Sequence, residues 1–221
     1  GLTEAGGVVS WNRPERYRFG TVGQALPGCE ITLADDGELL VRCPSLATPL
    51  QAGEGYVDAQ GFLHTGDVAE LQQGFVRLFD RKRDVIKTSG GKSVAPAKIE
   101  TRLRGKPGIA HAVVLGTESG RELVALVDLD QRWMMEISER EGLGCRSRAD
   151  LIEHPRIRQL VLTAIAEVND TLARHEHVAD FAFLPEPLRA SAGELTAAGT
   201  VRRATIARRH AGLLAALRGR G

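Results

Sequence analysis

Hydrophobic and polar positions change their pattern part of the way along the chain. The first eighty residues are rich in glycine and proline, and their apolar runs are short and divided by turn residues, at 29–33, 38–43, 62–63 and 75–79. Short apolar runs bounded by turn signals are typical of strands in a β-meander or barrel. The pattern therefore predicts a strand-rich region over residues 1–80.

Helical periodicity begins near residue 95. The segment "APAKIETRLRGK" predicts a first helix that starts near Ala95, and "IAHAVVLG" and "ELVALVDLD" predict strands. A long helix is predicted over 155–174, where apolar residues recur at helical spacing, namely Ile157, Val161, Ile165, Val168 and Leu172. This mixture of helices and strands indicates an α+β module.

The last part of the chain is expected to contain a strand, a polar turn and a basic helix. "VADFAFLP" has the composition of a strand, and "RASAGELTAAG" has that of a turn. The apolar side of the terminal helix is predicted to carry Ile206, Leu213, Leu214 and Leu217.

The change of pattern places a domain boundary near "FDRKRD", residues 79–84. A charged segment that leaves a strand suits a surface hinge, although an ordinary hairpin turn gives the same pattern. We expect a β-rich part over 1–80, a hinge over 81–84, and a small α+β domain with a mixed sheet and packed helices over 85–221.

Composition limits the class of protein. The chain has 221 residues, of which 43% are hydrophobic and 26% are charged, enough for one good core or two small ones. No apolar run approaches the roughly 18 residues that a membrane helix needs, and the start has no signal-like sequence. We expect a globular protein of the cytoplasm with no transmembrane segment, either free or peripheral at the membrane.

The charge distribution argues against a nucleic-acid partner. The formal net charge is only +1, so the molecule as a whole has no strong attraction for phosphate backbones. The last twenty residues are locally basic and contain Arg202, Arg203, Arg208, Arg209, Arg218 and Arg220. Because apolar residues recur on another side of the same segment, we expect these arginines on the solvated face of the terminal helix.

The three cysteines, Cys29, Cys43 and Cys145, form neither a zinc pattern nor an even set for disulfides, so we expect them to be reduced. "CEITLADDGELLVRC" predicts a hairpin with an Asp-Asp-Gly turn, which places Cys29 opposite Cys43. Both are expected to be small core residues.

Histidine and methionine positions are expected to serve structure. His175 and His177 alternate in "RHEHV" as neighbours on a strand do, but two histidines without a carboxylate at a known spacing are a weak basis for a metal site. Met134 and Met135 in "QRWMMEI" are expected on an amphipathic helix that packs on the α+β module.

The segment "DVIKTSGGKSVAP", residues 84–96, contains the second half of a P-loop pattern. The full pattern, G-x-x-x-x-G-K-[ST], needs a glycine five positions before Gly91, where this chain has Ile86. A β-branched residue cannot make that turn at low cost. A P-loop is therefore not predicted, and a tight turn before the helix is the simplest alternative.

Six motifs in order carry a resemblance to a known family. They are "GLTE" (1–4), "FGTVGQALPG" (19–28), "GELLVR" (37–42), "GFLHTGDVAEL" (61–71), "DRKRDVIKTSGGKSVAP" (80–96) and "GELT" (193–196). The set resembles the adenylate-forming (AMP-binding) superfamily, and within it the bacterial long-chain fatty acyl-CoA synthetases. The resemblance runs from the first residue to about residue 217.

The resemblance implies an ATP-dependent acid–thiol ligase that uses fatty acid, ATP, Mg²⁺ and CoA. A fatty acid carboxylate attacks ATP to give acyl-AMP and pyrophosphate, and the CoA thiol then displaces AMP. The resemblance also implies that the strand-rich part belongs to the β-barrel subdomain of the family's large domain. The small domain would rotate between the two steps about a hinge residue, which matches Arg83.

The nucleotide-binding residues follow from the resemblance. Asp67 in "HTGD" matches a carboxylate that accepts both ribose hydroxyls, and Arg81 in "DRKRD" matches a cation that reaches the ribose or its phosphate. Thr3 and Glu4 match residues that contact the α-phosphate and hold Mg²⁺. The structural alternatives are a turn-stabilising role for Asp67 and a solvated charge for Arg81.

The glycine pair belongs, by the same resemblance, to a loop that lies along the tunnel for the pantetheine arm of CoA. The matching residues are Ser89, Gly90, Gly91 and Lys92. Glycine suits such a loop because a bulky Cβ would block a chain that approaches closely. The loop can serve both as this surface and as the tight turn before the helix.

The distal loop departs from the family pattern. The family usually has "G-E-L-T-P-T-L-K-x-K-R", whose first lysine bridges the substrate carboxylate and the α-phosphate, whereas this chain has "GELTAAGTVRR". A gapless alignment puts Thr200 at the lysine position and Arg202 and Arg203 at the following basic positions. A neutral hydroxyl cannot offset the developing charge, so adenylation is expected to be impaired unless Arg202 substitutes. A smaller departure is Asp80 in place of a glycine, which bears on the tightness of a turn expected there.

The chain starts inside the family's "Y-G-x-T-E" motif. We therefore expect it to be the C-terminal piece of a longer protein, with the glycine- and serine-rich phosphate loop and most of the acyl-binding domain in a missing N-terminal segment. Two alternatives stay open. One is a catalytically impaired relative that acts as a binding or regulatory subunit, and the other is an acyl-AMP ligase that loads a carrier protein, although the intact "TSGGK" loop argues against the latter.

Overall fold

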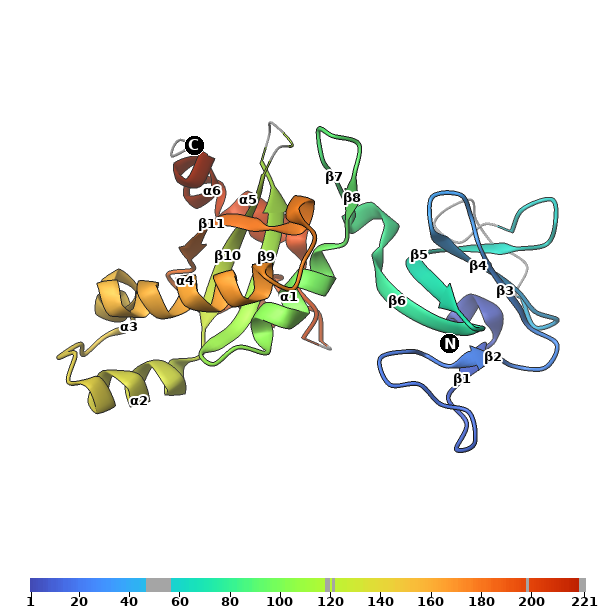
Figure 1. Ribbon diagram of the computed structural model, residues 1–221, viewed down its shortest axis with the longest axis horizontal. Coiled ribbons are helices and arrows are strands. Elements are labelled where there is room, and N and C mark those ends of the chain that lie inside the picture. The colour runs from blue at the N-terminus through green and yellow to red at the C-terminus, as the bar shows by residue number, and fades with distance from the viewer. Residues whose placement is uncertain (47–56, 118–119, 121, 198, 219–221) are drawn as a thin grey trace. The chain divides into compact units, whose positions relative to one another are not determined.

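The computed structural model describes residues 1–46, 57–117, 120, 122–197 and 199–218. It divides into two compact units, Gly1–Val85 and Ile86–Gly221, which are called here the first unit and the second unit. Figure 1 shows the elements of each unit.

The first unit is built on an antiparallel sheet. Its described strands lie in the order β1-β2-β6-β5-β4-β3. Their bounds are Ser10–Trp11 (β1), Gln24–Ala25 (β2), Glu30–Leu33 (β3), Glu38–Arg42 (β4), Leu63–Gln72 (β5) and Phe75–Arg81 (β6). Two 3₁₀ helices flank the sheet, Thr3–Ala5 (η1) and Lys82–Asp84 (η2). The strand-rich character that the short apolar runs predict is confirmed.

The predicted hairpin between the two cysteines is also confirmed. Strand β3 pairs with β4 so that Glu30 lies opposite Arg42, and the amide of Ala34 donates to the carbonyl of Glu38 at 2.9 Å across the turn. The same register places Cys29 opposite Cys43, and both are free thiols. Cys43 is buried, and Cys29 is half-buried against the same core.

The second unit consists of a mixed sheet with helices on both faces. Strand β10 (Leu123–Leu129) lies between β9 (Ile109–Gly116), which is antiparallel to it, and β11 (Val178–Phe183), which is parallel. A separate hairpin joins β7 (Ile86–Lys87) to β8 (Ser93–Val94). The mixed sheet that the sequence predicts is therefore observed.

Alternate residues of β10 enter two different cores. Leu123, Ala125 and Val127 pack with one group of helices. That group is α1 (Pro96–Arg104), α2 (Gln131–Glu141), α3 (Arg148–Glu153) and α4 (Pro155–Asn169). Val124 and Leu126 pack on the other face with residues of α5 (Arg203–Arg209) and α6 (Ala211–Arg218). The two short 3₁₀ helices of this unit are Arg174–Glu176 (η3) and Ala190–Ala192 (η4).

Local sequence signals explain where the helices begin. Pro96 and Pro155 occupy the first positions of α1 and α4, where the missing N–H costs no hydrogen bond. The Asp130 carboxylate caps α2 by accepting from the amide of Trp133 at 2.7 Å. Ser147 forms a capping box with Asp150 at the start of α3.

The structure corrects the expected C-terminal helix. The segment forms two helices that are interrupted at His210, not one continuous helix. Arg203 is also not on a solvated face, because its side chain is only 10% exposed and is paired with Glu100. The side chain of Arg218 and the whole of Arg220 lie outside the described residues.

Two smaller expectations are corrected, and the helix expected around Met134 and Met135 is confirmed as α2. The long helix ends at Asn169, so Leu172 packs on the core from beyond the helix. His175 lies in the 3₁₀ helix η3 and not on a strand. Met134 is fully buried as expected, whereas Met135 is 43% exposed.

Candidate functional site

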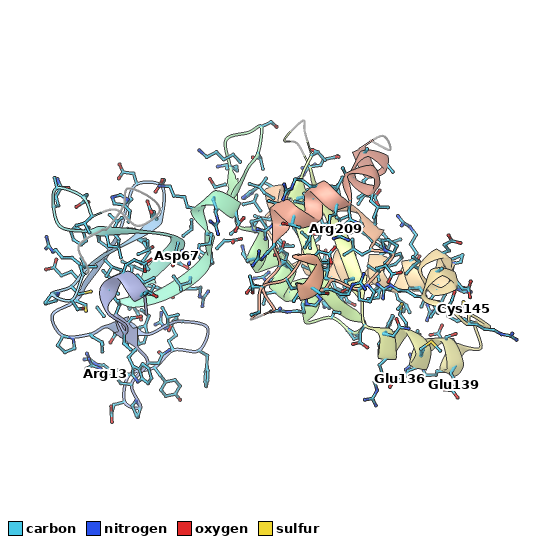
Figure 2. The ribbon with its side chains drawn as sticks, turned by 180° about the vertical axis from the view of Figure 1, so that it is seen from behind. Arg13, Asp67, Glu136, Glu139, Cys145 and Arg209 are labelled. Carbon is cyan, nitrogen blue, oxygen red and sulfur yellow. The ribbon has the colours of Figure 1, made fainter. Side chains whose placement is uncertain are left out.

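Asp67 and Arg81 form an ion pair in the first unit. The Nε atom of Arg81 lies 3.0 Å from the carboxylate of Asp67, and its Nη1 donates to the carbonyl of Thr65 at 3.0 Å. The two residues face each other because β5 and β6 place them directly opposite in the ladder. Figure 2 shows Asp67 on this part of the sheet. The Asp67 side chain is 16% exposed and that of Arg81 is 49% exposed, so a ligand can reach the guanidinium.

The electrostatics of Asp67 are set by burial. Burial raises the pKa of this carboxyl above its ordinary value of 3.8, the guanidinium of Arg81 opposes that rise, and the charges of Glu38 and Glu4 add to it. Burial and the guanidinium of Arg81 therefore act in opposite directions on the Asp67 carboxyl.

Glu38 anchors the backbone of the "HTGD" segment of β5, and sequence reasoning did not single it out. It is 4% exposed, and its carboxylate accepts hydrogen bonds from the Gly66 amide at 2.9 Å and from Lys82 Nζ at 2.8 Å. His64 Nδ1 lies 3.0 Å from the same carboxylate. Glu38 therefore positions the residue immediately before Asp67. The available signal was a charged residue at the start of an otherwise apolar strand in "GELLV".

Thr3 and Glu4 lie in η1, and both are exposed. The 3₁₀ turn is fixed by the hydroxyl of Ser45, which donates to the carbonyl of Ala5 at 2.7 Å. Their hydroxyl and carboxylate oxygens are thus presented to solvent from an anchored segment. A hydroxyl donor beside a hard oxygen ligand suits phosphate and Mg²⁺.

Lys82 fixes the segment that leads to the second unit. Its Nζ atom lies 2.7 Å from Asp36 and 2.8 Å from Glu38, and these two hydrogen bonds raise its pKa well above the ordinary value. Arg83, the predicted hinge residue, follows within η2. Asp80 lies within β6, so the turn that was expected at this position is a strand instead.

The segment Ser89–Lys92 is the turn of the β7–β8 hairpin in the second unit. The amide of Thr88 donates to the carbonyl of Lys92 at 2.8 Å, and the amide of Gly91 donates to the carbonyl of Thr88 at 2.9 Å. Gly91 has a φ of +73°, a conformation that favours glycine. Two strand residues and Ala95 separate this turn from α1, so the segment does not have the strand–loop–helix arrangement of a P-loop.

The glycines of this turn face open space. A Cβ atom at either Gly90 or Gly91 would meet no other atom within 4 Å. The side chains of Ser89 and Lys92 are exposed. Space is therefore available on this side of the hairpin for an extended ligand.

The distal loop that contains Thr200 is closed by its own hydrogen bonds. Leu195 and Val201 form an antiparallel bridge, and the amide of Thr196 donates to the carbonyl of Thr200 at 2.8 Å. Glu194 at the base of the loop is 4% exposed and pairs with Arg209 at 3.2 Å. Thr200 itself is exposed, and Ala198 of the same loop lies outside the described residues.

The two arginines that follow Thr200 have different environments. Arg203 donates to both carboxylate oxygens of Glu100, at 2.9 and 2.8 Å. Arg202 is exposed, and within the described residues its side chain has no recorded hydrogen bond or ion pair. Arg202 is therefore the cation of the pair that can move.

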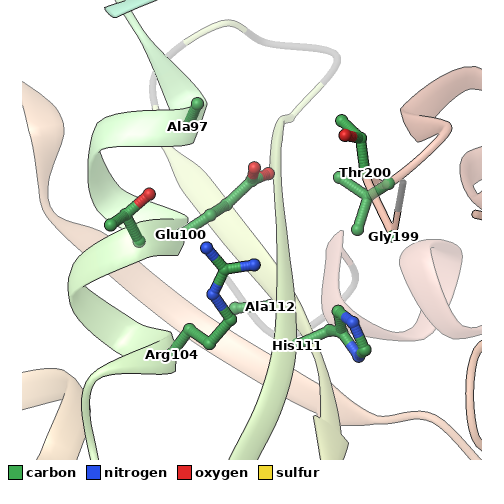
Figure 3. A pocket seen from close by; sticks show the side chains of 9 residues that line it. Ala97, Glu100, Arg104, His111, Ala112, Gly199 and Thr200 are labelled. Atoms are coloured by element: carbon green, nitrogen blue, oxygen red, sulfur yellow. The ribbon is translucent and has the colours of Figure 1, made fainter. Parts of the chain in front are cut away.

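A cavity of about 320 Å³ lies beside this loop in the second unit. It is lined by Ala97, Glu100, Thr101, Arg104, His111, Ala112, Gly199, Thr200 and Val201. Figure 3 shows Glu100 and Arg104 on α1, with His111 on the neighbouring strand and Thr200 across from them. Thr200 thus shares this cavity with one guanidinium, that of Arg104, and one carboxylate, that of Glu100.

No clustered metal site is found in the part of the chain that the structure describes, where no three His, Cys, Asp or Glu side chains are placed to hold an ion. Among the helices of that same part, none is long and apolar enough to cross a membrane.

Comparisons with known proteins point to one family. The model of the AMP-binding enzyme C-terminal domain matches residues 83–218. The chain is 32% identical over 219 residues to the long-chain-fatty-acid–CoA ligase FadD15 of Mycobacterium bovis, an alignment that covers 96% of this chain and 36% of the relative. It is 33% identical over 218 residues to the putative fatty-acid–CoA ligase fadD11 of Mycobacterium tuberculosis, covering 95% of this chain and 38% of the relative.

A solved structure shows the same fold. The A domain of the carboxylic acid reductase from Segniliparus rugosus superposes with a TM-score of 0.69 at 21% identity, and the match covers 90% of this chain and 32% of that one. The chain thus spans little more than a third of the length of the curated relatives above, 36% and 38%.

Proposed function

We propose a function from one premise, which is that this chain belongs to the AMP-binding, adenylate-forming enzymes and carries their C-terminal domain over residues 83–218. We propose that it forms the C-terminal portion of an ATP-dependent long-chain fatty acid–CoA ligase. The observation that carries the proposal is the half-buried pair of Asp67 and Arg81, joined at 3.0 Å beside an open approach to the guanidinium. The similarity to two fatty-acid–CoA ligases supports the choice of substrate class.

The proposed reaction has two steps. A fatty acid carboxylate oxygen attacks the α-phosphorus of ATP, the bond to the β-phosphate oxygen breaks, and pyrophosphate leaves. The CoA thiol then attacks the acyl carbon of the acyl-AMP, and AMP leaves with the bonding electron pair while the thiol loses its proton. ATP and CoA are the co-substrates, and we propose that the reaction takes place in the cytoplasm.

The first unit would hold the nucleotide. The Asp67 carboxylate accepts the ribose hydroxyls, and Arg81 donates to the ribose or to the phosphate. The hydroxyl of Thr3 donates to the α-phosphate. Glu38 supports this site indirectly, because it accepts a hydrogen bond from the Gly66 amide and so fixes the strand backbone immediately before Asp67.

Glu4 would supply the protein ligand for Mg²⁺. Its carboxylate is exposed on an anchored turn, and Mg²⁺ usually takes one or two carboxylates with substrate phosphates completing its shell. The donor type fits the ion. When bound, Mg²⁺ offsets negative charge on the phosphates.

The second unit would bind CoA through its hairpin turn. Gly90 and Gly91 leave an open surface along which the pantetheine arm can lie, and Ser89 and Lys92 offer polar groups beside it. The hinge is proposed at Arg83. Lys82, the preceding residue, is held by two carboxylates of the first unit, so rotation would start directly after this fixed point.

Adenylation needs a cation at the distal loop, and we propose that Arg202 supplies it. Thr200 cannot, because a hydroxyl carries no charge to offset the developing negative charge. Arg203 is committed to Glu100, whereas Arg202 is exposed one residue from the bridge that closes the loop. If Arg202 does not act in this way, the chain would serve instead as a binding or regulatory subunit. The uncharged Thr200 at the lysine position favours that alternative.

The test joins this chain to the N-terminal part of the FadD15 relative and supplies preformed acyl-AMP and CoA. We expect thioester to form, and we expect Asp67→Ala to slow the reaction by about 10–100-fold, since a buried hydrogen-bonding carboxylate is lost. Asp35→Ala is the matched control, because Asp35 is exposed in the β3–β4 turn. Equal rates for the two variants would refute the assigned nucleotide site. Absence of any thioester with the parent chain would favour the binding-subunit alternative.

A further inference from the structure

Exposed apolar side chains concentrate in one segment of the first unit. Of the eight large hydrophobic residues that are exposed in the described part of the chain, five lie between residues 8 and 22. They are Val8 at 51%, Trp11 at 57%, Tyr17 at 58%, Phe19 at 86% and Val22 at 39%. The segment 10–20 is called here the aromatic–basic loop.

The aromatic–basic loop is held in place by many hydrogen bonds. Asn12 Oδ1 accepts from the amide of Arg18 at 3.1 Å, and Asn12 Nδ2 donates to the carbonyl of Thr21 at 2.8 Å. Arg13 and Arg16 are joined by two backbone hydrogen bonds. The aromatic side chains are therefore exposed by an organised backbone and not by a frayed one.

Arg18 and an aromatic pair complete this organisation. Arg18 Nη1 donates to Gln72 Oε1 at 2.8 Å, and its guanidinium lies over the ring of Phe75 at 5.0 Å from the centroid. The rings of Tyr17 and Phe19 meet edge to face, with centroids 5.4 Å apart. Arg18 thus ties the loop to the β5–β6 hairpin and leaves the two rings on the outside.

The loop is also positively charged. It contains Arg13, Arg16 and Arg18 against a single acid, Glu15. The side chains of Arg13 and Arg16 are exposed and, in the described residues, have no recorded hydrogen bond or ion pair. Figure 2 shows Arg13 at the margin of this unit. Apolar rings and unneutralised cations therefore occur on the same short surface.

We propose that the aromatic–basic loop docks on an anionic lipid surface. Tryptophan and tyrosine favour the boundary between lipid headgroups and acyl chains, and arginines beside them pair with lipid phosphates. Phe19, the most exposed ring, would enter the acyl region. A loop that presents exposed rings and exposed cations together matches a flat, negatively charged surface with an apolar interior. This inference does not depend on the proposed ligase activity.

The test uses the chain itself and the emission of Trp11. The chain has two tryptophans, so Trp133→Phe leaves Trp11 as the single reporter. Vesicles of phosphatidylcholine alone are compared with vesicles of equal parts phosphatidylcholine and phosphatidylglycerol. We expect a blue shift and protection from acrylamide with the anionic vesicles only, and both should weaken as salt is added. Trp11→Phe, which keeps Trp133, should show neither effect.

Variants of the aromatic–basic loop then separate the apolar contribution to vesicle binding from the electrostatic one. Phe19→Ser should lower the partition coefficient by about tenfold or more. Arg13→Ser combined with Arg16→Ser should lower it by about 10–30-fold. The matched control combines Leu162→Ser with Arg140→Ser, which remove an exposed apolar side chain and an exposed cation from the second unit.

Four outcomes would overturn the proposal. They are no response of Trp11 to anionic vesicles, equal binding to neutral vesicles, an equal loss in the control variant, and protection of Trp11 from acrylamide without any vesicle. The last result would mean that protein covers the loop, through a second copy or another partner.

Discussion

Arg203 donates to both carboxylate oxygens of Glu100, at 2.9 and 2.8 Å, and so joins the start of α5 to α1. Glu100 also accepts from the amide of Val114 on β9 at 2.8 Å, so one carboxylate connects three elements. Both side chains are 10% exposed. The pair commits Arg203 to Glu100, whereas the neighbouring Arg202 is exposed.

The first prediction concerns this pair. Arg203→Met should lower the free energy of unfolding of the second unit by about 3–5 kcal/mol, because Glu100 would stay buried without its main cation. Arg202→Met should change it by less than about 0.5 kcal/mol, since Arg202 is exposed. Urea unfolding, followed by Trp133 fluorescence in a Trp11→Phe background, measures both. Similar losses in the two variants would contradict the different environments of the arginines.

The second prediction concerns adenylation in the protein joined to the FadD15 N-terminal part. Arg202→Ala should slow pyrophosphate exchange by about 10²–10³-fold, whereas transfer from supplied acyl-AMP to CoA should keep its rate. The reason is that the cation is needed only while negative charge builds up between the carboxylate and the α-phosphate. Thr200→Lys should restore exchange in the Arg202→Ala background. If exchange is slow in the parent and Thr200→Lys alone raises it, Arg202 is not the substitute.

The third prediction compares two glycines with left-handed backbones. A Cβ at Gly108 (φ +82°) would lie 2.4 Å from the ring of Trp133, whereas a Cβ at Gly142 (φ +63°) would meet nothing within 4 Å. Gly142→Ala should therefore lower the free energy of unfolding by about 1–2 kcal/mol, which is the cost of a left-handed backbone for alanine. Gly108→Ala should lower the free energy of unfolding by about 1–3 kcal/mol more than Gly142→Ala does, because the Trp133 ring must move. Thermal unfolding of the two variants measures the difference, and equal shifts would show that the Trp133 ring adjusts freely.

The fourth prediction concerns acid stability of the first unit. Burial raises the pKa of Glu38, but the hydrogen bonds from Lys82, His64 and the Gly66 amide lower it more, so it lies below its ordinary value of 4.5. The unfolded state then binds this proton more readily than the native state. The stabilisation is present above pH 4.5 and is lost as the pH falls through the lower native pKa.

Lys82→Met tests this dependence. It should lower the free energy of unfolding by about 1–2 kcal/mol near neutral pH, since Glu38 and Asp36 lose a donor that they share. It should also flatten the loss of stability as the pH falls through the lowered pKa values of these two carboxyls. Asp67 has a raised pKa, which changes the stability with pH in the opposite direction. It is therefore replaced by Asn in both the Lys82→Met variant and its parent, so that it does not mask the change of unfolding free energy with pH. Urea unfolding over a pH series, with Trp11 as the reporter, gives the two slopes. Parallel slopes would mean that Lys82 does not set the Glu38 pKa.

Features that depend only on neighbouring residues could be predicted from the amino-acid sequence. The Asp-Asp-Gly turn and the alternation around it were enough to place Cys29 opposite Cys43, and helical spacing after Pro96 was enough to predict α1. The apolar runs of β9 and β10 identified both strands. These signals are short in range, because turn geometry and side-chain periodicity are set within a few residues.

Which of two similar neighbouring residues has a partner depends on the fold. Arg202 and Arg203 are equally basic in the sequence, but only Arg203 meets Glu100, which lies 103 residues away. Burial of a charged side chain depends on which distant groups the fold brings within hydrogen-bonding distance, and that information is not present in any local window of the chain.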